Sequence, residues 1–382
     1  MRIIYCIDSL SNCGGRERVT TVKANYLAEH GWDVSIIVYN QGDDKPYFAL
    51  SPKVRVINLE VDYSDRGSHR WRFLARQAKK REHKEKLTAA LKQLQPDIVV
   101  STFCEEARLL PAIHDGSKKI LEIHYNRYYL WQNTWMSDRR PIRLLSVIFQ
   151  MVRDRQTAKQ YDAFVCLTHR DAKSWGRMKN IHVVSNPVTI SESRQADTSL
   201  KRVITAGRLT NQKRHDILIR CWAKVATDIR KGWTLDIYGN GEFQRQLEQQ
   251  IADLGIQDSV RILAPVKNIA EEYQRSSIFA LTSDFEGFPL VLCEAMSTGL
   301  PPVAIDCPCG PSDMIQDESM GMLIPMGRED LFVEKLQQLM SDAELRRRMG
   351  AAARHSINAR YTVEVIMQEW TTLFHELGVT NK

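Results

Sequence analysis

Short apolar segments alternate with longer amphipathic segments along the whole chain. Each apolar segment has the length of one buried β-strand, and the amphipathic segments have the spacing of helices that cover a sheet. The first series of expected strands comprises residues 2–8, 32–40, 54–60, 97–103, 118–125, 163–168 and 181–188. The second series comprises residues 201–209, 234–242, 260–266, 277–284, 302–308 and 321–327. This alternation predicts an α/β protein with parallel, doubly wound sheets.

The two series predict two domains, because 382 residues exceed the length at which one hydrophobic core usually stops growing. The polar stretch 185–201 contains Pro187, shows no periodicity, and is the expected linker. This division gives an N-terminal domain of residues 1–188 and a C-terminal domain of residues 189–361. Ligands of doubly wound sheets lie outside the carboxyl ends of the strands, so two such domains placed face to face would share one cleft.

The segment 283–306 carries two acidic residues in a distinctive frame. A strand ends near Asp284, a short loop contains Glu286, and an apolar helix is expected from about Leu290 to Gly299, with Pro289 in its first turn. Glu294 lies in this helix within the apolar run VLCEAM, where an unpaired charge is costly. The spacing alone is equally compatible with two solvated acids.

The frame EGFPLVLCE, with Glu286 and Glu294, resembles the Glu-x(7)-Glu signature of glycosyltransferase family four. The resemblance covers nearly the whole chain. It implies the GT-B architecture, in which two Rossmann-like domains enclose a donor cleft, and sugar transfer with retention of configuration and without a metal. It also implies that Glu294 holds the ribose hydroxyls and that Glu286 faces hydroxyls of the transferred sugar. The residues that would offer backbone amides near the sugar and phosphates are Phe288, Pro289, Leu290 and Val291.

A second segment, residues 205–225, carries two cations beside a turn. It begins as a strand, turns at Gly207 and enters a helix near Lys213, so Arg208 and Lys213 flank the turn at the carboxyl end of the strand. Such a pair is usually a solvated face. A departing nucleotide diphosphate gains negative charge, however, and fixed cations would stabilise that transition state without a metal. The frame GRLTNQKRHD resembles the phosphate-binding pattern of the family, which favours the functional interpretation.

Two candidates lie in the N-terminal half. Gly14 and Gly15 precede an amphipathic helix, where the backbone could approach an anion closely, although a double glycine is more often a plain turn. The pair is not the GxGxxG fingerprint of an oxidoreductase but resembles the glycine loop of the family, with Arg16 where a small residue is usual. His124 ends an apolar strand; such a residue is usually structural, but the corresponding histidine of the family lies near the sugar and acceptor.

Three weaker similarities complete the comparison with the family. The loop residues Gly239, Gly241 and Val266 would line the nucleotide base. The amphipathic helix 362–378 would pack back on the N-terminal domain, as the last helix of the family does. The segment DCPCGPSDMI resembles a variant that is common among polysaccharide-building members.

Charge is unevenly distributed between the two halves. Residues 1–190 contain 31 Lys and Arg against 20 Asp and Glu, a net charge of +11, whereas the remainder carries −4. This asymmetry predicts an anionic partner, and because no helix-turn-helix, zinc or RNP pattern accompanies it, we expect no nucleic acid. The basic segments 66–86 and 139–155 interleave cations with apolar side chains and predict docking on an anionic membrane surface. The alternative is a solvated helix with a stripe that faces the core.

The remaining composition places the protein in the cytoplasm. The eight cysteines are scattered, and Cys307 and Cys309 are too close together for a zinc knuckle, so we expect reduced thiols and no metal site. The first residues predict a strand and not a signal peptide. The longest nearly apolar stretch, residues 144–152, is much shorter than the roughly 20 residues of a spanning helix. We therefore expect a cytoplasmic protein, at most peripheral on the inner face of the cell membrane.

These patterns and the resemblance to the family together imply a retaining, metal-independent glycosyltransferase that uses no cofactor. It would move a hexose-type sugar from a nucleotide diphosphate sugar, with UDP as the commoner nucleotide, to a saccharide or lipid-linked acceptor. The resemblance to capsular, exopolysaccharide and lipopolysaccharide transferases implies cell-surface polysaccharide biosynthesis. The expected catalytic residues are His124, Arg208, Lys213 and Glu286. The alternatives are a GT-B sugar nucleotide epimerase and a catalytically silent nucleotide-sugar-binding protein.

Overall fold

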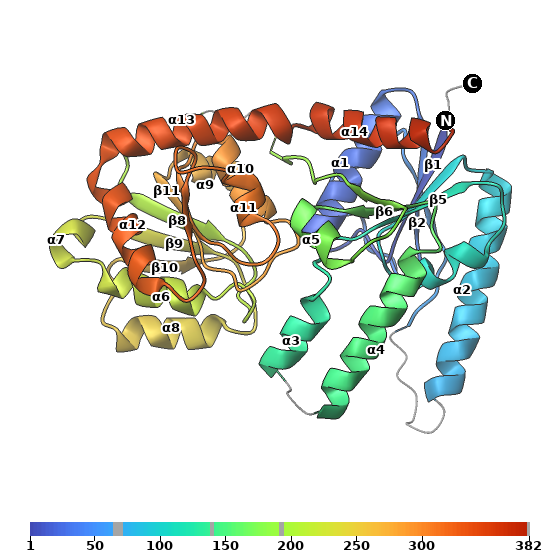
Figure 1. Cartoon of the computed structure of the whole chain (residues 1–382), viewed down its shortest axis with the longest axis horizontal. Helices are drawn as coiled ribbons and strands as arrows, with labels where there is room; N and C mark the ends of the chain where they lie inside the picture. Colours follow the sequence, from blue (N-terminus) through green and yellow to red (C-terminus); the bar gives the residue numbers. More distant parts are fainter. Residues whose placement is uncertain (64–71, 138–140, 191–194, 380–382) are drawn as a thin grey trace.

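The protein consists of two α/β domains that lie side by side, and both the first strand and the last helix of the chain lie in the N-terminal domain (Figure 1). The computed structural model describes residues 1–63, 72–137, 141–190 and 195–379. Within these ranges, each domain contains one parallel sheet, of seven strands in the first domain and six in the second. The prediction of two doubly wound α/β domains is therefore confirmed.

The sheet of the N-terminal domain has the strand order β3-β2-β1-β4-β5-β6-β7. Its strands are β1 (Arg2–Ile7), β2 (Asp33–Val38), β3 (Arg55–Asn58), β4 (Ile98–Ser101), β5 (Lys118–Glu122), β6 (Ala163–Cys166) and β7 (Ile181–Val183). In β1, Ile3 and Tyr5 pack into one hydrophobic core and Ile4 and Cys6 into another on the opposite face. Both faces of this central strand are buried, which explains why it appears in the sequence as a continuous apolar run.

Helices cover both faces of this sheet (Figure 1). They are α1 (Gly15–Glu29), α2 (Arg72–Leu94), α3 (Tyr129–Ser137), α4 (Pro141–Ala158) and α5 (His169–Ser174), with the short 3-10 helices η1 (Glu105–Arg108) and η2 (Leu110–Ala112). α2, α3 and α4 extend beyond the sheet on the same side of the molecule (Figure 1).

The sheet of the C-terminal domain has the strand order β10-β9-β8-β11-β12-β13. Its strands are β8 (Arg202–Ala206), β9 (Thr234–Tyr238), β10 (Val260–Leu263), β11 (Ile278–Leu281), β12 (Pro302–Ile305) and β13 (Met322–Ile324). The helices of this domain are α6 (His215–Lys224), α7 (Thr227–Arg230), α8 (Gln244–Asp253), α9 (Ile269–Gln274), α10 (Leu290–Ser297), α11 (Pro311–Met314), α12 (Glu329–Ser341) and α13 (Ala343–Arg360). Every strand expected from the sequence is thus present in the described residues.

One helix start differs slightly from the sequence prediction. α6 begins at His215, two residues after Lys213, because Arg214 adopts a left-handed backbone with φ 49° and its guanidinium binds Asp216 and Asp284. α10 begins at Leu290, as predicted, with Pro289 directly before the helix and not in its first turn. The loops that precede α6 and α10, at the carboxyl ends of β8 and β11, carry the candidate site.

The last helix, α14 (Val363–Glu376), continues from α13 and lies along α1 of the N-terminal domain (Figure 1). The ring centroids of Trp32 and Phe374 are 5.7 Å apart, and Trp370 is fully buried. The C-terminal residues therefore complete the core of the first domain. The exact division of the chain at residues 188 and 189 stays a prediction.

Candidate active site

An ion pair lies at the carboxyl end of the C-terminal sheet. Lys213 follows β8 and Glu286 follows β11, and these strands are neighbours in the sheet, so the two loops meet. Lys213 Nζ lies 2.7 Å from Glu286 Oε1, and both side chains are largely buried. The stem of Lys213 runs beside Gly207, where an added Cβ would lie 3.4 Å from Lys213 Cε. Two of the predicted residues are thus in direct contact.

Arg208 and Val266 lie on the exposed rim of the same sheet. In the part of the chain that the structure describes, no ion pair engages the exposed guanidinium of Arg208. Val266, in the loop after β10, is 42% exposed. Both side chains are therefore accessible to a ligand, Arg208 as a cation and Val266 as an apolar surface.

Gly239 and Gly241 have a packing role. A Cβ at Gly239 would lie 1.9 Å from the carbonyl oxygen of Gly207, and one at Gly241 would lie 2.4 Å from that of Leu209. The absence of side chains thus lets the loops after β8 and β9 touch. Contact of these glycines with a nucleotide base stays a prediction.

Glu294 is buried inside α10 and has partners that the sequence did not reveal. Arg18 Nη1 lies 2.8 Å from its Oε1, and Thr189 Oγ1 donates a hydrogen bond to the same oxygen at 2.5 Å. Burial raises the pKa of Glu294, and these two partners oppose the rise. Arg18 comes from α1 of the N-terminal domain. A carboxylate in apolar surroundings needs a polar partner, but the sequence did not identify Arg18 or Thr189 as that partner.

The expectation that four consecutive residues offer backbone amides needs correction. Pro289 has no N–H group, and the amide of Leu290 already donates to the carbonyl of Phe288 at 2.8 Å. The Phe288 side chain is buried, with its ring 5.6 Å from that of Tyr361. Within the helix, Val291 keeps an amide in the first turn, where intrahelical acceptors are missing.

The loop of Glu286 also touches the N-terminal domain. A Cβ at Gly287 would lie 2.8 Å from the carbonyl oxygen of His124, and Asn126 Nδ2 donates to the carbonyl of Glu286 at 2.8 Å. The His124 side chain itself is nearly buried. His124 and Glu286, which are far apart in the sequence, therefore come together at the junction of the two domains. Asn126 is a further contact that the sequence did not identify.

The glycine loop approaches the same junction from α1. A Cβ at Gly15 would lie 2.9 Å from Leu290 Cδ1, so this loop faces the start of α10. A Cβ at Gly14 would lie 2.3 Å from Glu17 Oε2. The carboxylate of Glu17 thus lies against the loop at which the sequence predicted a bound anion. A phosphate at this loop would contact the negatively charged Glu17.

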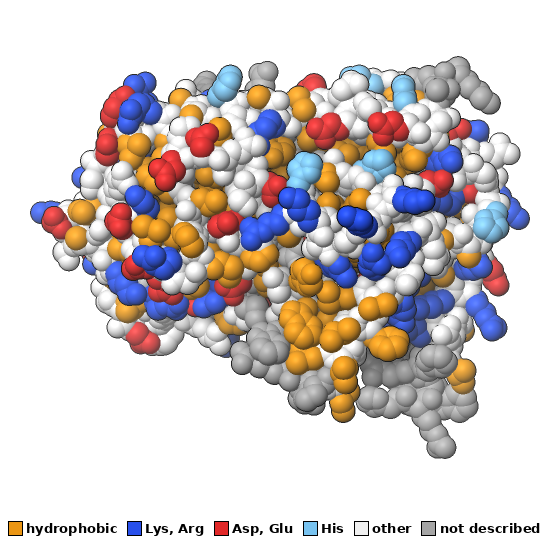
Figure 2. All heavy atoms as spheres, in the orientation of Figure 1, with side chains coloured by type: hydrophobic (Ala, Val, Ile, Leu, Met, Phe, Trp, Pro, Cys, Tyr) orange, Lys and Arg blue, Asp and Glu red, His pale blue; other side chains and the backbone are white. Residues whose placement is uncertain are grey.

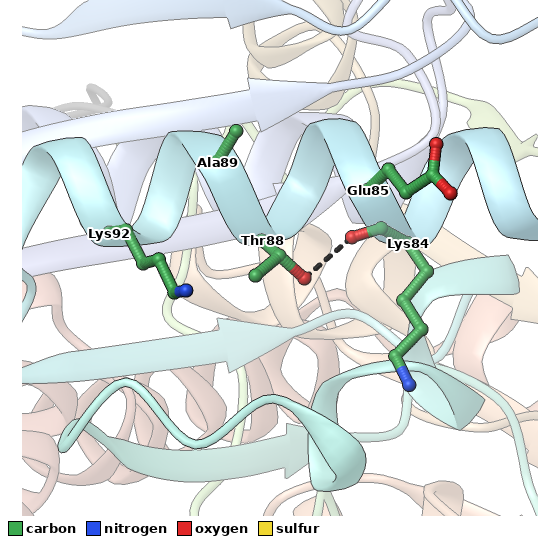
Figure 3. A pocket seen from close by; sticks show the side chains of 5 residues that line it. All are labelled: Lys84, Glu85, Thr88, Ala89 and Lys92. Atoms are coloured by element: carbon green, nitrogen blue, oxygen red, sulfur yellow. Dashed lines mark hydrogen bonds between the residues drawn. The ribbon is translucent and has the colours of Figure 1, made fainter.

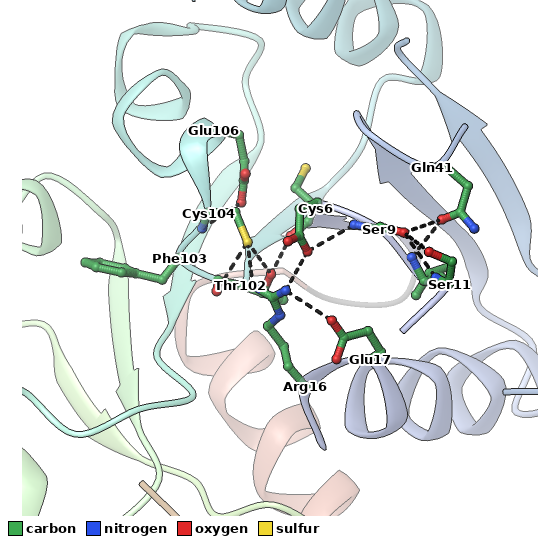
Figure 4. A network of polar contacts seen from close by, with 12 residues as sticks. Cys6, Ser9, Ser11, Arg16, Glu17, Gln41, Thr102, Phe103, Cys104 and Glu106 are labelled. Atoms are coloured by element: carbon green, nitrogen blue, oxygen red, sulfur yellow. Dashed lines mark hydrogen bonds and ion pairs between the residues drawn. The ribbon is translucent and has the colours of Figure 1, made fainter. Parts of the chain in front are cut away.

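Arg16, at the position where a small residue is usual, belongs to a polar network at the end of β1 (Figure 4). Its guanidinium lies 2.5 Å from Asp8 and donates to the Cys104 sulfur at 2.8 Å. Behind Cys104, the buried Glu106 accepts a hydrogen bond from Ser101 Oγ at 2.7 Å. Burial raises the pKa of Glu106 to about 7, and the Ser101 bond opposes the rise. The network therefore fixes Arg16 within its own domain.

Other hollows of the surface are separate from this junction. Figure 3 shows one along α2, which is lined by Lys84, Glu85, Thr88, Ala89 and Lys92. A second lies beside β13, between Ile315 and Lys335. Neither contains a predicted site residue, so neither belongs to the candidate site at the junction.

The eight cysteines are free thiols. Cys307 and Cys309 are both buried, and burial raises the pKa of Cys309 to about 12. In the ranges that the structure describes, no three His, Cys, Asp or Glu side chains gather as metal ligands would.

Solved structures share this two-domain arrangement. One is a mutant of TarM from Staphylococcus aureus, in complex with Fondaparinux, alpha-GlcNAc-glycerol and UDP. It matches with a TM-score of 0.77 at 15% identity, over 98% of this chain and 99% of that chain. The fold is thus that of a GT-B glycosyltransferase.

The sequence comparisons agree with the fold. The family described as Glycosyltransferase Family 4 matches residues 13–192, and the family described as Glycosyl transferases group 1 matches residues 189–356. Together these two models cover residues 13–356, and the chain is a glycosyltransferase. Among its relatives is the amylovoran biosynthesis glycosyltransferase AmsD of Erwinia amylovora, 28% identical over 98% of this chain and 99% of that protein. Another is a Campylobacter jejuni alpha-1,4-N-acetyl-D-galactosaminyltransferase whose named acceptor is a saccharide on diphospho-undecaprenol, 27% identical over 99% of each.

Proposed function

We propose that this glycosyltransferase moves a hexose-type sugar from UDP to a saccharide or lipid-linked acceptor, with retention of configuration and without a metal ion. The acceptor belongs to cell-surface polysaccharide biosynthesis. The observation that carries the proposal is the meeting of the Lys213–Glu286 ion pair with the backbone of His124 at one domain junction. A donor seated there would touch a cation, a carboxylate and an imidazole at once.

The cations of the C-terminal domain act on the diphosphate. When the bond from the anomeric carbon to the phosphate oxygen breaks, its electron pair stays on the diphosphate, whose negative charge grows. Lys213 and the exposed Arg208 lie on the loop after β8 and stabilise this charge in place of a metal. Lys213 is held by Glu286 at 2.7 Å, so its ammonium is positioned before the donor arrives.

The carboxylates act on hydroxyl groups. Glu294 binds the ribose hydroxyls, and Glu286 accepts hydrogen bonds from the sugar. Arg18 and Thr189 keep the Glu294 carboxylate in one orientation inside the apolar α10, which reduces the reorganisation needed on donor binding. The acceptor hydroxyl attacks the anomeric carbon from the face that the diphosphate leaves, and its proton passes to the departing phosphate oxygen.

The comparisons support the donor and acceptor classes. The related fold of TarM holds UDP together with alpha-GlcNAc-glycerol, and an α-linked product beside UDP is the pair expected when an α-linked donor reacts with retention. AmsD is named for the biosynthesis of amylovoran, and the Campylobacter enzyme for a saccharide on diphospho-undecaprenol. Both names favour an acceptor that is a growing surface saccharide.

Assay of UDP release tests the proposal. The protein is incubated with UDP-sugars, with and without a diphospho-undecaprenol saccharide, and the anomeric configuration of the product is read by NMR. We expect acceptor-dependent UDP release and an α-linked product from an α-linked donor. An epimerised donor without transfer would identify an epimerase. Donor binding by thermal shift, about 2.7 kcal/mol at 100 times the dissociation constant, with no UDP release would identify a silent binding protein.

The proposal includes docking on an anionic membrane, where a lipid-linked acceptor is held. α4 supports it with an apolar face that points outward (Figure 2). Ile142 is 82% exposed and Phe149 is 80% exposed, and Leu145 and Val152 continue the same face at helical spacing. The alternative prediction, a stripe that faces the core, is therefore wrong for these side chains. No helix of the described chain is long and apolar enough to span a membrane.

The basic segments support docking to different degrees. In α2, Arg76 pairs with Glu105 at 2.6 Å and Lys79 with Glu82 at 3.1 Å, so fewer cations are free than the sequence suggested. Arg81 and Lys84 remain on the exposed face of α2. Each cation near an anionic surface contributes about 1 kcal/mol. Residues 66–71 and 139–140, which belong to the two predicted segments, lie outside the described residues, as do the side chains of Arg72 and Phe73.

Liposome flotation tests docking. The variant Ile142→Ser/Phe149→Ser removes two exposed side chains and should fold normally, because neither contributes to the core. The control Leu200→Ser/Leu254→Ser changes two exposed apolar residues of the C-terminal domain. We expect the wild type to bind vesicles rich in anionic lipid, the α4 variant to lose binding, and the control to keep it. Binding that is equal for both variants, or absent for the wild type, would refute the docking face.

A further inference from the structure

A fully buried ion pair lies directly behind His124. The side chains of Lys23 in α1 and Glu122 in β5 are 0% and 1% exposed, and Lys23 Nζ lies 2.6 Å and 2.5 Å from the two carboxylate oxygens. The ammonium also faces the ring of Trp370 in α14, 4.4 Å from its centroid. Burial alone would raise the pKa of Glu122, but the charges and hydrogen bonds of Lys23 and His124 together outweigh burial and lower the pKa to about 2. Glu122 is therefore a carboxylate with a fixed position.

This carboxylate faces the imidazole of His124. Glu122 is the last residue of β5, and His124 follows two positions later, so both side chains leave the chain on the same side. Glu122 Oε2 lies 3.5 Å from His124 Nε2, a buried atom with no hydrogen-bond partner among the described residues. This distance exceeds a normal hydrogen bond, and catalytic hydrogen bonds often shorten when substrate binds.

We propose that Glu122 is a positioning residue for His124: it keeps the ring proton on Nε2, so that Nδ1 accepts a hydrogen bond from a hydroxyl group of the sugar or of its acceptor. The opposite tautomer would place the lone pair of Nε2 against a fixed negative charge. Lys23 holds Glu122, and α14 covers Lys23 through Trp370, so the last helix of the chain completes the support. This inference rests on the proposed role of His124 in transfer.

A variant must remove the carboxylate without leaving a buried charge unpaired. Glu122→Gln alone would strand the ammonium of Lys23, which is strongly destabilising, whereas replacing both members of a buried pair is often tolerated. The test variant is therefore Lys23→Met/Glu122→Gln. The matched control is Lys119→Met/Asp115→Asn, which removes a second buried ion pair at the opposite end of β5. Thermal melting of both variants verifies that each is folded.

Kinetics separate a positioning role from a structural one. We expect Lys23→Met/Glu122→Gln to lower kcat roughly 10- to 100-fold with little change in the KM of the donor, and the control to keep wild-type kcat. In a His124→Ala background the same double change should lower kcat less than about 2-fold, because the residue it acts through is gone. Wild-type kcat in the test variant, or an equal loss in both backgrounds, would overturn the inference.

Hydrolysis of the donor without acceptor distinguishes the two hydroxyl sources. A loss in both hydrolysis and transfer assigns the hydroxyl to the sugar, and a loss in transfer alone assigns it to the acceptor. Full activity of His124→Ala would overturn the catalytic role of His124 and, with it, the part of the inference that depends on transfer.

The tautomer itself is observable. In protein labelled with ¹⁵N-histidine, long-range ¹H–¹⁵N correlations report which ring nitrogen carries the proton, and His124→Ala assigns the signal. We expect the Nε2–H form in the wild type and a mixture of tautomers in Lys23→Met/Glu122→Gln. An Nδ1–H form in the wild type would overturn the inference independently of any activity.

Discussion

Glu106 offers a sharp test of the electrostatics of the N-terminal domain. Its carboxyl group is buried behind Cys104, Ser101 Oγ donates to one oxygen at 2.7 Å, and the other oxygen has no partner among the described residues. Burial raises its pKa from 4.5 to about 7. Glu106→Gln keeps the acceptor for Ser101 and, like the protonated acid, carries no charge.

The sign and size of the effect follow from proton linkage. Between pH 4.5 and 7 the folded protein keeps the proton on Glu106 while the unfolded chain releases it, so the free energy of unfolding falls as pH rises through this window. A difference of about 2.5 pKa units corresponds to roughly 3 kcal/mol. We therefore expect Glu106→Gln to match the wild type near pH 4 and to be more stable by about 3 kcal/mol at pH 8.

Urea unfolding of both proteins between pH 4 and 8 measures this difference. The wild-type profile alone is insufficient, because His83 also contributes to it. Burial lowers the pKa of His83 to about 4, so its contribution to the free energy of unfolding rises as pH rises from 4 to 6.5. Subtracting the two profiles removes the contribution of His83. The control Glu105→Gln changes the neighbouring carboxyl, which is partly exposed and paired with Arg76, and should give a difference below about 1 kcal/mol at every pH. A difference between Glu106→Gln and wild type that does not change with pH would refute the reasoning.

Three further predictions concern activity. Lys213→Ala and Glu294→Ala should each slow transfer about 30- to 1000-fold, or roughly 2 to 4 kcal/mol, because each removes a charged contact with the donor. Both variants should stay folded. A wild-type rate in either purified variant would show that its residue does not belong to the site. Transfer should survive EDTA, and loss of activity that manganese restores would instead assign the diphosphate to a metal. Gly287→Ala should lower kcat/KM at least about tenfold, because the new Cβ would lie 2.8 Å from the backbone oxygen of His124 and must separate the domains. In Gly15→Ala the new Cβ would lie 2.9 Å from the flexible end of the Leu290 side chain, so kcat/KM should fall less than in Gly287→Ala. A larger loss of kcat/KM in Gly15→Ala than in Gly287→Ala would contradict the proposed contact between the domains.

The sequence by itself determined the strands and the local frames of the site. Every expected strand was found. The central strands are buried on both faces and must therefore be apolar throughout, a pattern that is visible in consecutive residues. The frame that joins Glu286 to Glu294 is equally local, since one loop and one helix hold both residues. The direct contact of Lys213 with Glu286, which are 73 positions apart in the sequence, was not predicted.

The tertiary structure decided which distant residues meet. Glu294 finds Arg18, and Glu122 finds Lys23 across 99 positions, because the strand order and the apposition of two domains bring those elements together. Periodicity carries no information about such pairs. The apolar face of α4 could not be placed from the sequence either, because an apolar stripe has the same helical spacing whether it is buried or exposed. Only the packing of the surrounding helices left Ile142 and Phe149 at the surface.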